Sequence, residues 1–410
     1  MSSHDAWRYA FHRHLAATSP EPIGIVVDRA EGPFLYAPDG RRYIDLLAGI
    51  GVANIGHMHP EVIEAVERQI RRHHHVMVYG EYVQEAQALY AEELVAAAPP
   101  GLDRVYFVNS GAEAVEGALK VARKATGRTG LVCFRGAYHG DTMGALSVVG
   151  SKIYRTPFEP LLEPVTVLSF GDGANLEAID ESVGAVIVEP VQGEGGVRVP
   201  PAAFLPALRA RCTEVGALLV LDEVMTGFGR TGSLYACTRS GVLPDILVHA
   251  KALGGGFPLG AFLASEALMS TLAKDPPLCH VTTFGGHPVS CAAGRAALRV
   301  LLRDDLPRRA EVVGARFRAR LRETLAQFSQ VREVRGAGLM IGIELCDPVL
   351  TTALVETCRD RGVLLGWTLH HDHILRLTPP LNVPESVLEE ALEILAAGLG
   401  DLTGSARPGA

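Results

Sequence analysis

The sequence lacks several features that would assign it to a specialised class of protein. Aromatic residues make up only 6% of the 410 residues, and the seven scattered cysteines form no Cys-X-X-Cys pair. An odd number of cysteines without a secretory signal argues for free thiols in a reducing compartment. No apolar run is long enough to span a bilayer. We therefore expect a cytoplasmic protein with no membrane partner.

An excess of positive charge is also missing. The chain has 38 Lys and Arg residues against 46 Asp and Glu residues, a net charge of −8. This balance gives no electrostatic reason to bind nucleic acid. No GxxxxGK(S/T) motif occurs, and Gly254-Gly255-Gly256 follow a lysine instead of opening a GxGxxG pattern, so a nucleotide-binding protein is only a remote alternative.

Two apolar runs near the middle of the chain each lead to one charged residue. Residues 218–221 are aliphatic and precede Asp222, and residues 246–248 lead to Lys251. Aliphatic runs bounded by polar residues and glycine are typical of buried strands in a parallel sheet. Ligands bind beyond the carboxyl ends of such strands, so Asp222 and Lys251 should face one crevice. They suit a cofactor with a ring nitrogen and an aldehyde.

A third predicted strand, residues 105–108, leads into a helix. Ser110 and Glu113 have the spacing of a capping box, which marks the start of that helix. A helix N-terminus with Gly111 directly after a serine offers free N–H groups and the positive end of a dipole to a phosphate. An ordinary capped helix explains this turn equally well.

Two more predicted strands end in polar or aromatic residues. Residues 131–134 precede Tyr138 and His139, an aromatic pair able to stack on a flat ring. Residues 185–188 precede Glu189, and Glu194 lies in the glycine-rich loop behind it. Each residue has an ordinary structural explanation alone. Together, a phosphate cradle, an aromatic face, an acid and an amine are what pyridoxal 5′-phosphate (PLP) requires.

Composition and periodicity divide the chain into four parts. We expect an N-terminal segment (1–46) with a hairpin, a large cofactor-binding domain (47–303), a small α+β domain (304–400) and a disordered tail (401–410). The triplet His73-His74-His75 would not share one helix face, so no metal site is expected there. Helices are predicted over residues 60–73, 85–98, 111–124, 206–215, 289–302, 307–327, 351–361 and 384–399.

Over nearly its whole length the sequence resembles the class III (ω-) aminotransferases of the fold-type I PLP family, especially the acetylornithine, ornithine and putrescine aminotransferases. The resemblance lies in SGAEAVEGALKVAR (110–123), EPVQGEGG (189–196), LDEVMTGFGRTG (221–232), KALGGGFPLG (251–260), HVTTFGGHP (280–288) and LRLTPPL (375–381). It implies an α/β fold with a mostly parallel seven-stranded central sheet flanked by helices, plus a smaller α+β C-terminal domain. It also implies a homodimer with shared active sites.

The resemblance further implies a role for each site residue. Lys251 would form a Schiff base with the cofactor and move a proton, Asp222 would hold the pyridine nitrogen protonated, and Glu189 would complete the catalytic set. The residues expected to contact the cofactor are Ser110, Gly111, Ala112, Tyr138, His139, Asp222, Val224, Met225, Lys251 and, from the neighbouring subunit, Thr283. Arg376 would bind a substrate carboxylate, and Glu194 would pair with it when the substrate has none.

Three positions depart from the pattern of the ornithine and acetylornithine branch. Asp141 stands where that branch has a carboxylate-binding arginine, and an aspartate would repel a carboxylate. Met225 stands where glutamine often contacts the phenolic oxygen of the cofactor, and His287 replaces an asparagine. The class of reaction is expected to survive these changes, whereas the identity of the amine is left open.

The function predicted is transfer of an ω-amino group from a diamine, or from an ornithine-like or acetylornithine-like amino acid, to a 2-oxo acid such as 2-oxoglutarate. An aminomutase, decarboxylase or racemase would use the same Asp222 and Lys251, so these PLP reactions are the alternative. A non-catalytic role has little support, because charged residues at strand ends are costly to bury without a ligand.

Overall fold

A seven-stranded sheet lies at the centre of the computed structural model, which describes residues 3–20, 22–78 and 80–404. β10 runs antiparallel to both of its neighbours, and every other strand points the same way. The mostly parallel sheet predicted from the sequence is therefore confirmed. In spatial order the strands are β4 (Arg104–Val108), β10 (Gly260–Ala264), β9 (Ile246–His249), β8 (Leu218–Asp222), β7 (Val183–Val188), β5 (Gly130–Phe134) and β6 (Val165–Leu168).

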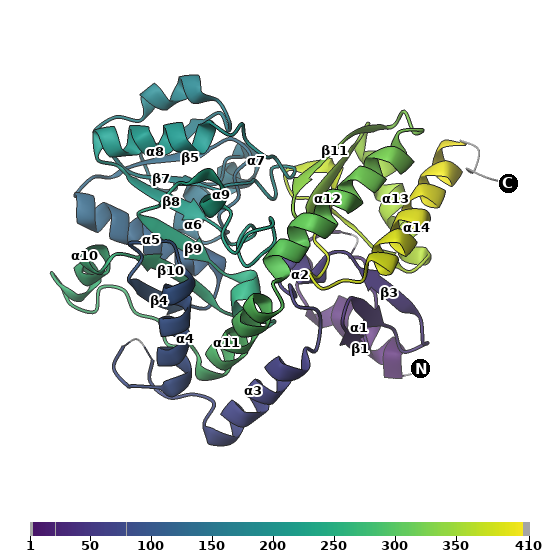
Figure 1. Ribbon diagram of the computed structural model, residues 1–410, viewed down its shortest axis with the longest axis horizontal. Helices are drawn as coiled ribbons and strands as arrows, with labels where there is room; N and C mark the ends of the chain where they lie inside the picture. Colours follow the sequence, from purple (N-terminus) through teal and green to yellow (C-terminus); the bar gives the residue numbers. More distant parts are fainter. Residues whose placement is uncertain (1–2, 21, 79, 405–410) are drawn as a thin grey trace.

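Helices cover both faces of this sheet, because successive side chains of a strand point to opposite sides. In β5, Leu131 and Cys133 belong to the apolar cluster of α5 (Gly111–Thr126). Val132 and Phe134 belong to the cluster on the other face, which includes side chains of α4 (Glu85–Ala97), α8 (Phe204–Val215) and α11 (Pro288–Arg303). The result is a three-layer α/β arrangement (Figure 1).

The remaining helices of this part lie at its edge or in the connections. α3 (Pro60–Arg72) packs against α11. The short elements are α2 (Ala48–Gly51), α6 (Met143–Ser147), α7 (Lys152–Arg155), η1 (Thr156–Phe158), η2 (Gly173–Ala178), α9 (Cys237–Ser240), η3 (Lys251–Gly254), α10 (Glu266–Met269) and η4 (Ser270–Ala273).

The C-terminal part is built on a separate antiparallel sheet. Its order is β11 (Val331–Ala337), β12 (Met340–Leu345), β15 (His371–Leu377) and β14 (Gly366–Thr368), with helices α12 (Leu306–Leu325), α13 (Pro348–Asp360) and α14 (Glu385–Thr403). The predicted tail is wrong for residues 401–403, which continue α14, because Leu399 and Gly400 keep that helix buried against its neighbours. Residues 405–410 lie outside the described residues.

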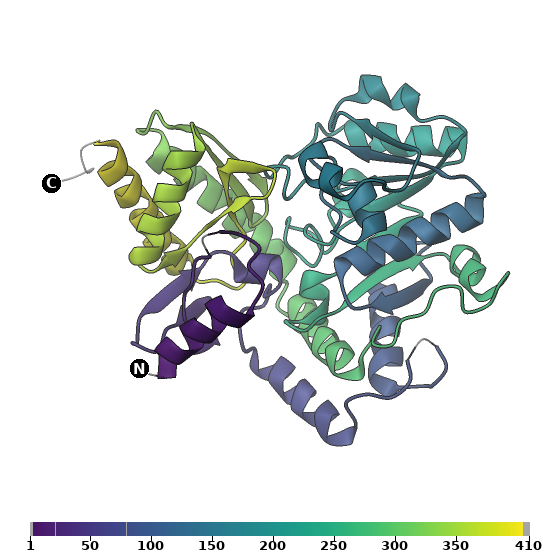
Figure 2. The ribbon, with the colours of Figure 1, turned by 180° about the vertical axis from the view of Figure 1, so that it is seen from behind.

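The N-terminal segment lies beside the C-terminal part. α1 (Ser3–His14) precedes β1 (Arg29–Glu31), β2 (Phe34–Tyr36) and β3 (Arg42–Asp45), and β3 pairs in parallel with β13 (Val363–Leu364). Figures 1 and 2 show these segments, far apart in the sequence, side by side. The predicted hairpin is confirmed, since β2 and β3 are antiparallel around a turn in which Gly40 has φ 86°. Within the described ranges, no helix is long and apolar enough to cross a membrane.

Candidate active site

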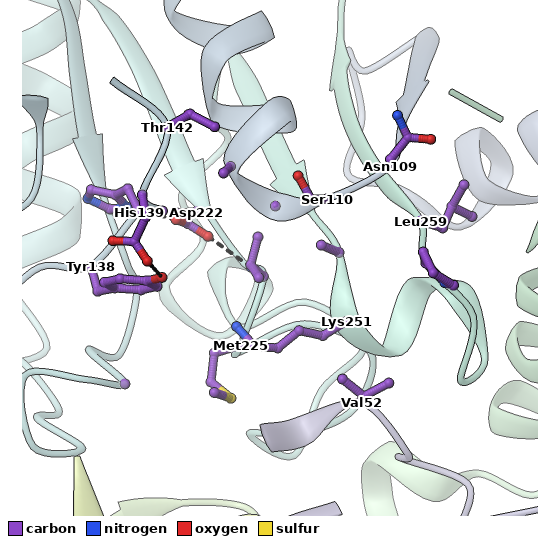
Figure 3. A pocket seen from close by; sticks show the side chains of 18 of the residues that line it. Val52, Asn109, Ser110, Tyr138, His139, Thr142, Asp222, Met225, Lys251 and Leu259 are labelled. Carbon is purple, nitrogen blue, oxygen red and sulfur yellow. Dashed lines mark hydrogen bonds and ion pairs between the residues drawn. The ribbon is translucent and has the colours of Figure 1, made fainter. Parts of the chain in front are cut away.

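A cavity of about 750 Å³ opens at the edge of the sheet where β4, β5, β7, β8 and β9 end (Figure 3). The predicted crevice is therefore present, and Asp222 and Lys251 both line it. The other predicted residues that line it are Ser110, Gly111, Ala112, Tyr138, His139, Glu189, Glu194, Val224 and Met225. Thr283 and Arg376 are not among its lining residues.

The N-terminus of α5 faces into the cavity. The Ser110 hydroxyl accepts a hydrogen bond from the Glu113 N–H at 3.2 Å, and Glu113 accepts one from the Asn109 N–H at 2.7 Å. The first N–H groups of a helix have no partner inside the helix, so those of Gly111 and Ala112 can bind an anion. A Cβ atom at Gly111 would lie 3.2 Å from a methyl group of Val224, which accounts for a glycine here.

Asp222 lies at the end of β8 and is 4% exposed. One carboxylate oxygen lies 2.7 Å from Nδ1 of His139, and the other accepts a hydrogen bond from the Val224 N–H at 3.0 Å. The Nε2 atom of His139 is buried and has no partner among the described residues. His139 therefore orients Asp222, whose carboxylate could pair with a cationic ring nitrogen.

Lys251 begins η3 directly after β9, with φ 50°. Burial lowers the pKa of its ammonium group, and the opposing negative charges of Asp222 and Glu194 do not restore it. A lysine whose pKa is lowered has a larger neutral fraction and is the better nucleophile and base. Figure 3 shows the Lys251 side chain reaching into the cavity beside Met225.

Glu189 follows β7 and is 5% exposed. Its two oxygens accept hydrogen bonds from the N–H groups of Tyr138, at 3.1 Å, and Gly193, at 2.8 Å. Burial raises its pKa to about 7 against the opposing charge of His139. Both oxygens thus have protein donors, and Glu189 ties together the loops that follow β5 and β7. Its catalytic role stays a prediction.

Arg376 and Glu194 form an ion pair at the border between the cavity and the C-terminal sheet. Arg376 lies in β15, and Glu194 also accepts a hydrogen bond from the Leu369 N–H at 2.7 Å. Burial acts to raise the pKa of Glu194, but the charge of Arg376 and this hydrogen bond together lower it. The pairing predicted between the two residues is present, while carboxylate binding by Arg376 stays a prediction.

Three further residues were predicted to contact the cofactor: Thr283, Met225 and Tyr138. Thr283 is exposed and lies outside the cavity lining, so nothing in this chain tests its predicted place at a neighbouring subunit's phosphate. Met225 packs against Gly51, where a Cβ atom would lie 2.9 Å from the methionine sulfur. The hydroxyl of Tyr138 donates to Asp141 at 2.8 Å, and the Tyr138 ring lines the cavity (Figure 3).

Sequence reasoning missed part of the cavity wall. Val52 comes from the glycine-containing loop after β3, and Phe257, Pro258 and Leu259 come from the loop before β10. Gly49 and Gly51, which adopt positive φ angles in the structure, were the available sequence signal for the first loop. The second lies within the motif KALGGGFPLG, whose apolar residues carry no chemistry that would single them out.

Other expectations concerned metals and nucleotides. Over the ranges that the structure describes, no group of three or more His, Cys, Asp or Glu side chains is arranged to hold a metal ion. Gly254, Gly255 and Gly256 lie between η3 and β10. A phosphate loop requires a helix after its glycines, so this position does not fit a nucleotide site.

The fold and the cavity together define a class of protein. The N-terminus of α5, Asp222 and Lys251 converge from the carboxyl ends of separate strands, where they could receive a phosphate, a ring nitrogen and an aldehyde. Gly111 leaves room between this helix and Val224. These residues fit PLP, and their arrangement is that of a fold-type I PLP-dependent enzyme.

Comparisons with known proteins agree with this class. The family model described as Aminotransferase class-III matches residues 15–399, and the chain belongs to this family. It is 45% identical over 385 residues to the acetylornithine aminotransferase of Mycobacterium bovis, covering 93% of each chain. It is 41% identical over 397 residues to the putrescine aminotransferase of Pectobacterium atrosepticum, covering 93% of this chain and 84% of the relative.

A solved structure gives the same result for the fold. The ornithine aminotransferase from Toxoplasma gondii, crystallised with partial occupancy of PLP at its active site, matches with a TM-score of 0.91 at 30% identity. The match covers 98% of this chain and 95% of that one. The resemblance found in the sequence is thereby confirmed.

Proposed function

We propose that this class III aminotransferase uses PLP to move an ω-amino group from a diamine or an ornithine-like amino acid to a 2-oxo acid, with 2-oxoglutarate as the expected acceptor. The observation that carries the proposal is that Lys251, Asp222 and the N-terminus of α5 line one cavity. The names of the related acetylornithine and putrescine aminotransferases support the choice of substrates.

When bound, PLP supplies an aldehyde and an electron-poor ring on which an amino group can be exchanged. The N–H groups of Gly111 and Ala112 would hold its phosphate, and the Asp222 carboxylate would keep a proton on its ring nitrogen. Tyr138 and Val224 would pack on the two faces of the ring. Lys251, with its lowered pKa, would carry a proton between the substrate carbon that bears the amino group and the cofactor.

The Arg376–Glu194 pair offers a way to accept two kinds of substrate. With a diamine bound, the pair would stay closed, and no unpaired cation would lie beside the substrate. With a 2-oxo acid bound, the substrate carboxylate would replace Glu194 on Arg376. Bidentate recognition of a carboxylate suits the planar guanidinium group.

The proposed assembly is a homodimer in the cytoplasm. Thr283 is exposed in this chain and does not line its own cavity, which is compatible with a residue that completes a neighbouring subunit's phosphate site. Light scattering of the purified protein checks the assembly. A monomer that is fully active would contradict it.

The reaction is tested with purified protein loaded with PLP. We expect a yellow solution that loses its colour when an amine donor is added and regains it with a 2-oxo acid. N-acetylornithine, ornithine, putrescine, lysine and β-alanine, each with 2-oxoglutarate and with pyruvate, identify the donor and the acceptor. Conversion of the amine without any amino acid formed from the oxo acid would favour an aminomutase, decarboxylase or racemase instead.

A further inference from the structure

The carboxylates in the cavity wall differ in the partners that they have. Among the described residues that line the cavity, four carry a carboxylate, and three of these have dedicated partners: Asp222 has His139, Glu194 has Arg376, and Glu189 has two backbone N–H groups. The fourth, Asp141, is exposed, and no cation of the described chain forms an ion pair with it. Its hydrogen bond comes from the Tyr138 hydroxyl.

A structural role at the nearby helix does not explain Asp141. Asp141 precedes α6, where an aspartate is a common N-terminal cap. The cap of α6 is instead Glu116, which accepts hydrogen bonds from the N–H groups of Gly144, at 2.8 Å, and Ala145, at 3.1 Å, and from the Thr142 hydroxyl, at 2.6 Å. The Asp141 carboxylate therefore does not cap α6.

The phenol of Tyr138 fixes the orientation of this carboxylate. The Tyr138 hydroxyl donates to Oδ2 of Asp141, which leaves Oδ1 available to a ligand. Burial raises the pKa of the Tyr138 phenol, and Asp141 raises it further, so the phenol stays a donor at neutral pH. Tyr138 and Asp141 both line the cavity, so a substrate bound there would lie beside the Asp141 carboxylate.

We propose that Asp141 binds the second, non-reacting ammonium group of the amino donor, so that diamines are preferred over donors whose far end is neutral or negative. The inference rests on the proposed aminotransferase function and narrows its substrate. A carboxylate at the far end of the donor would meet Asp141 with like charge, and Arg376 cannot offset this while it is paired with Glu194. An unpaired carboxylate held by a neutral donor is instead complementary to an ammonium group.

The test compares putrescine with butylamine, which has the same carbon chain and lacks the second ammonium. The measured quantity is the rate at which each amine discharges the yellow colour of the PLP-loaded protein, as a function of amine concentration. For Asp141→Asn we expect the half-saturating concentration of putrescine to rise roughly tenfold to a hundredfold, since a hydrogen bond to a charged group is lost. The value for butylamine should stay the same.

Two further variants sharpen the test. Asp141→Arg should weaken putrescine more than Asp141→Asn does and should improve N-acetylornithine, which carries a carboxylate. Asp103→Asn, an exposed carboxylate outside the cavity lining, removes the same charge and should change neither amine. Melting temperatures of all variants report whether the fold is intact.

The outcomes separate this inference from the proposed function. If putrescine and butylamine respond alike to Asp141→Asn while both still discharge the colour, the assignment of Asp141 is wrong and the aminotransferase function stands. If no amine discharges the colour of the wild-type protein, the proposed function fails and this inference fails with it.

Discussion

Asp222 and Glu223 are adjacent in the sequence but belong to two different regions of the molecule. The alternation of side chains at the end of β8 points Asp222 towards α5 and the cavity. Glu223 points to the opposite face, where it is 1% exposed. Each carboxylate has a histidine nearby, His139 beside Asp222 and His249 at the end of β9 near Glu223.

The side chains of Glu223 and His249 are buried away from solvent. Glu223 accepts hydrogen bonds from the N–H groups of Ala236, at 2.7 Å, and Cys237, at 2.8 Å, and from the Thr226 hydroxyl, at 3.0 Å. Burial raises the pKa of Glu223 and lowers that of His249 to about 4. Among the described residues neither ring nitrogen of His249 has a side-chain partner, and its ring lies 4.9 Å from that of Tyr235.

Groups with a shifted pKa occur in both regions, but they differ in what the shift indicates. Burial shifts the pKa of Lys251 and Glu189 in one region and that of Glu223 and His249 in the other. Only the first region opens onto a cavity that a substrate can enter. A shifted pKa therefore marks a functional site only where the group is also accessible. In the second region burial shifts the pKa values of groups that no substrate can reach, and the hydrogen bonds that Glu223 accepts hold the chain segment 226–237 in place.

The largest expected effect is that of Lys251→Ala. Loss of the amine should lower kcat by more than about a thousandfold, because nucleophile and proton carrier are removed together. The melting temperature should not fall, since the variant also removes a buried ammonium group. Steady-state assays and calorimetry measure both. Normal turnover by this variant would overturn the role of Lys251.

The adjacent carboxylates allow a paired experiment. Asp222→Asn should lower kcat roughly a hundredfold or more with little change in stability, because the charge opposite the ring nitrogen is lost. Glu223→Gln should lower the free energy of unfolding by about 1–3 kcal/mol, because an amide nitrogen would face backbone N–H donors, and the folded protein should keep its kcat. The distinction between the two regions is wrong if both substitutions lower kcat, or if both lower the free energy of unfolding.

The pH dependence of stability should reflect His249. Its folded-state pKa of about 4 lies below its ordinary value of 6.5, so the folded state binds this proton less tightly. The stability it contributes is fully present above pH 6.5 and is lost as the pH falls towards 4, an effect on the order of a few kcal/mol. His249→Phe should flatten this part of the profile of unfolding free energy.

The control for that experiment is His74→Phe, which changes an exposed histidine. Its profile should follow that of the wild-type protein. If His249→Phe keeps the wild-type loss of stability between pH 6.5 and 4, then His249 is not the group responsible.

The smallest of these effects is expected at Arg376. Arg376→Ala should raise KM for 2-oxo acids by about tenfold or more, through loss of a charge-assisted hydrogen bond, and should affect diamines less. Melting curves are needed alongside, because Glu194 is left without its partner. Equal loss for diamines and 2-oxo acids would rule out carboxylate binding as its role.

Much of the sheet could be predicted from the sequence. The apolar runs before Asp222 and Lys251 are aliphatic and bounded by polar residues, so their burial and their common edge followed from pattern alone. The predicted helices are present, with ends shifted by a few residues. β6, by contrast, was missed: Val165–Leu168 is a strand of only four residues at the edge of the sheet.

Long-range pairing could not be predicted. β13 pairs with β3 across more than 300 residues of sequence, and no local pattern specifies such a partner. Arg230 was missed for the same reason: it is fully buried, and its guanidinium binds Asn54 and the carbonyl oxygens of Leu339 and Pro379, which come from three distant segments. Burial lowers its pKa to about 9. A charged residue in a glycine-rich motif gives no sign in the sequence that its side chain is fully buried.

The most direct test of the account is to locate the bound PLP chemically. Borohydride reduction of the PLP-loaded protein fixes the cofactor to the lysine that holds it, and mass spectrometry of the peptides identifies that residue. We expect a single phosphopyridoxyl group on the peptide containing Lys251, and none in Lys251→Ala. Label on another lysine, or no label on a yellow wild-type protein, would contradict it.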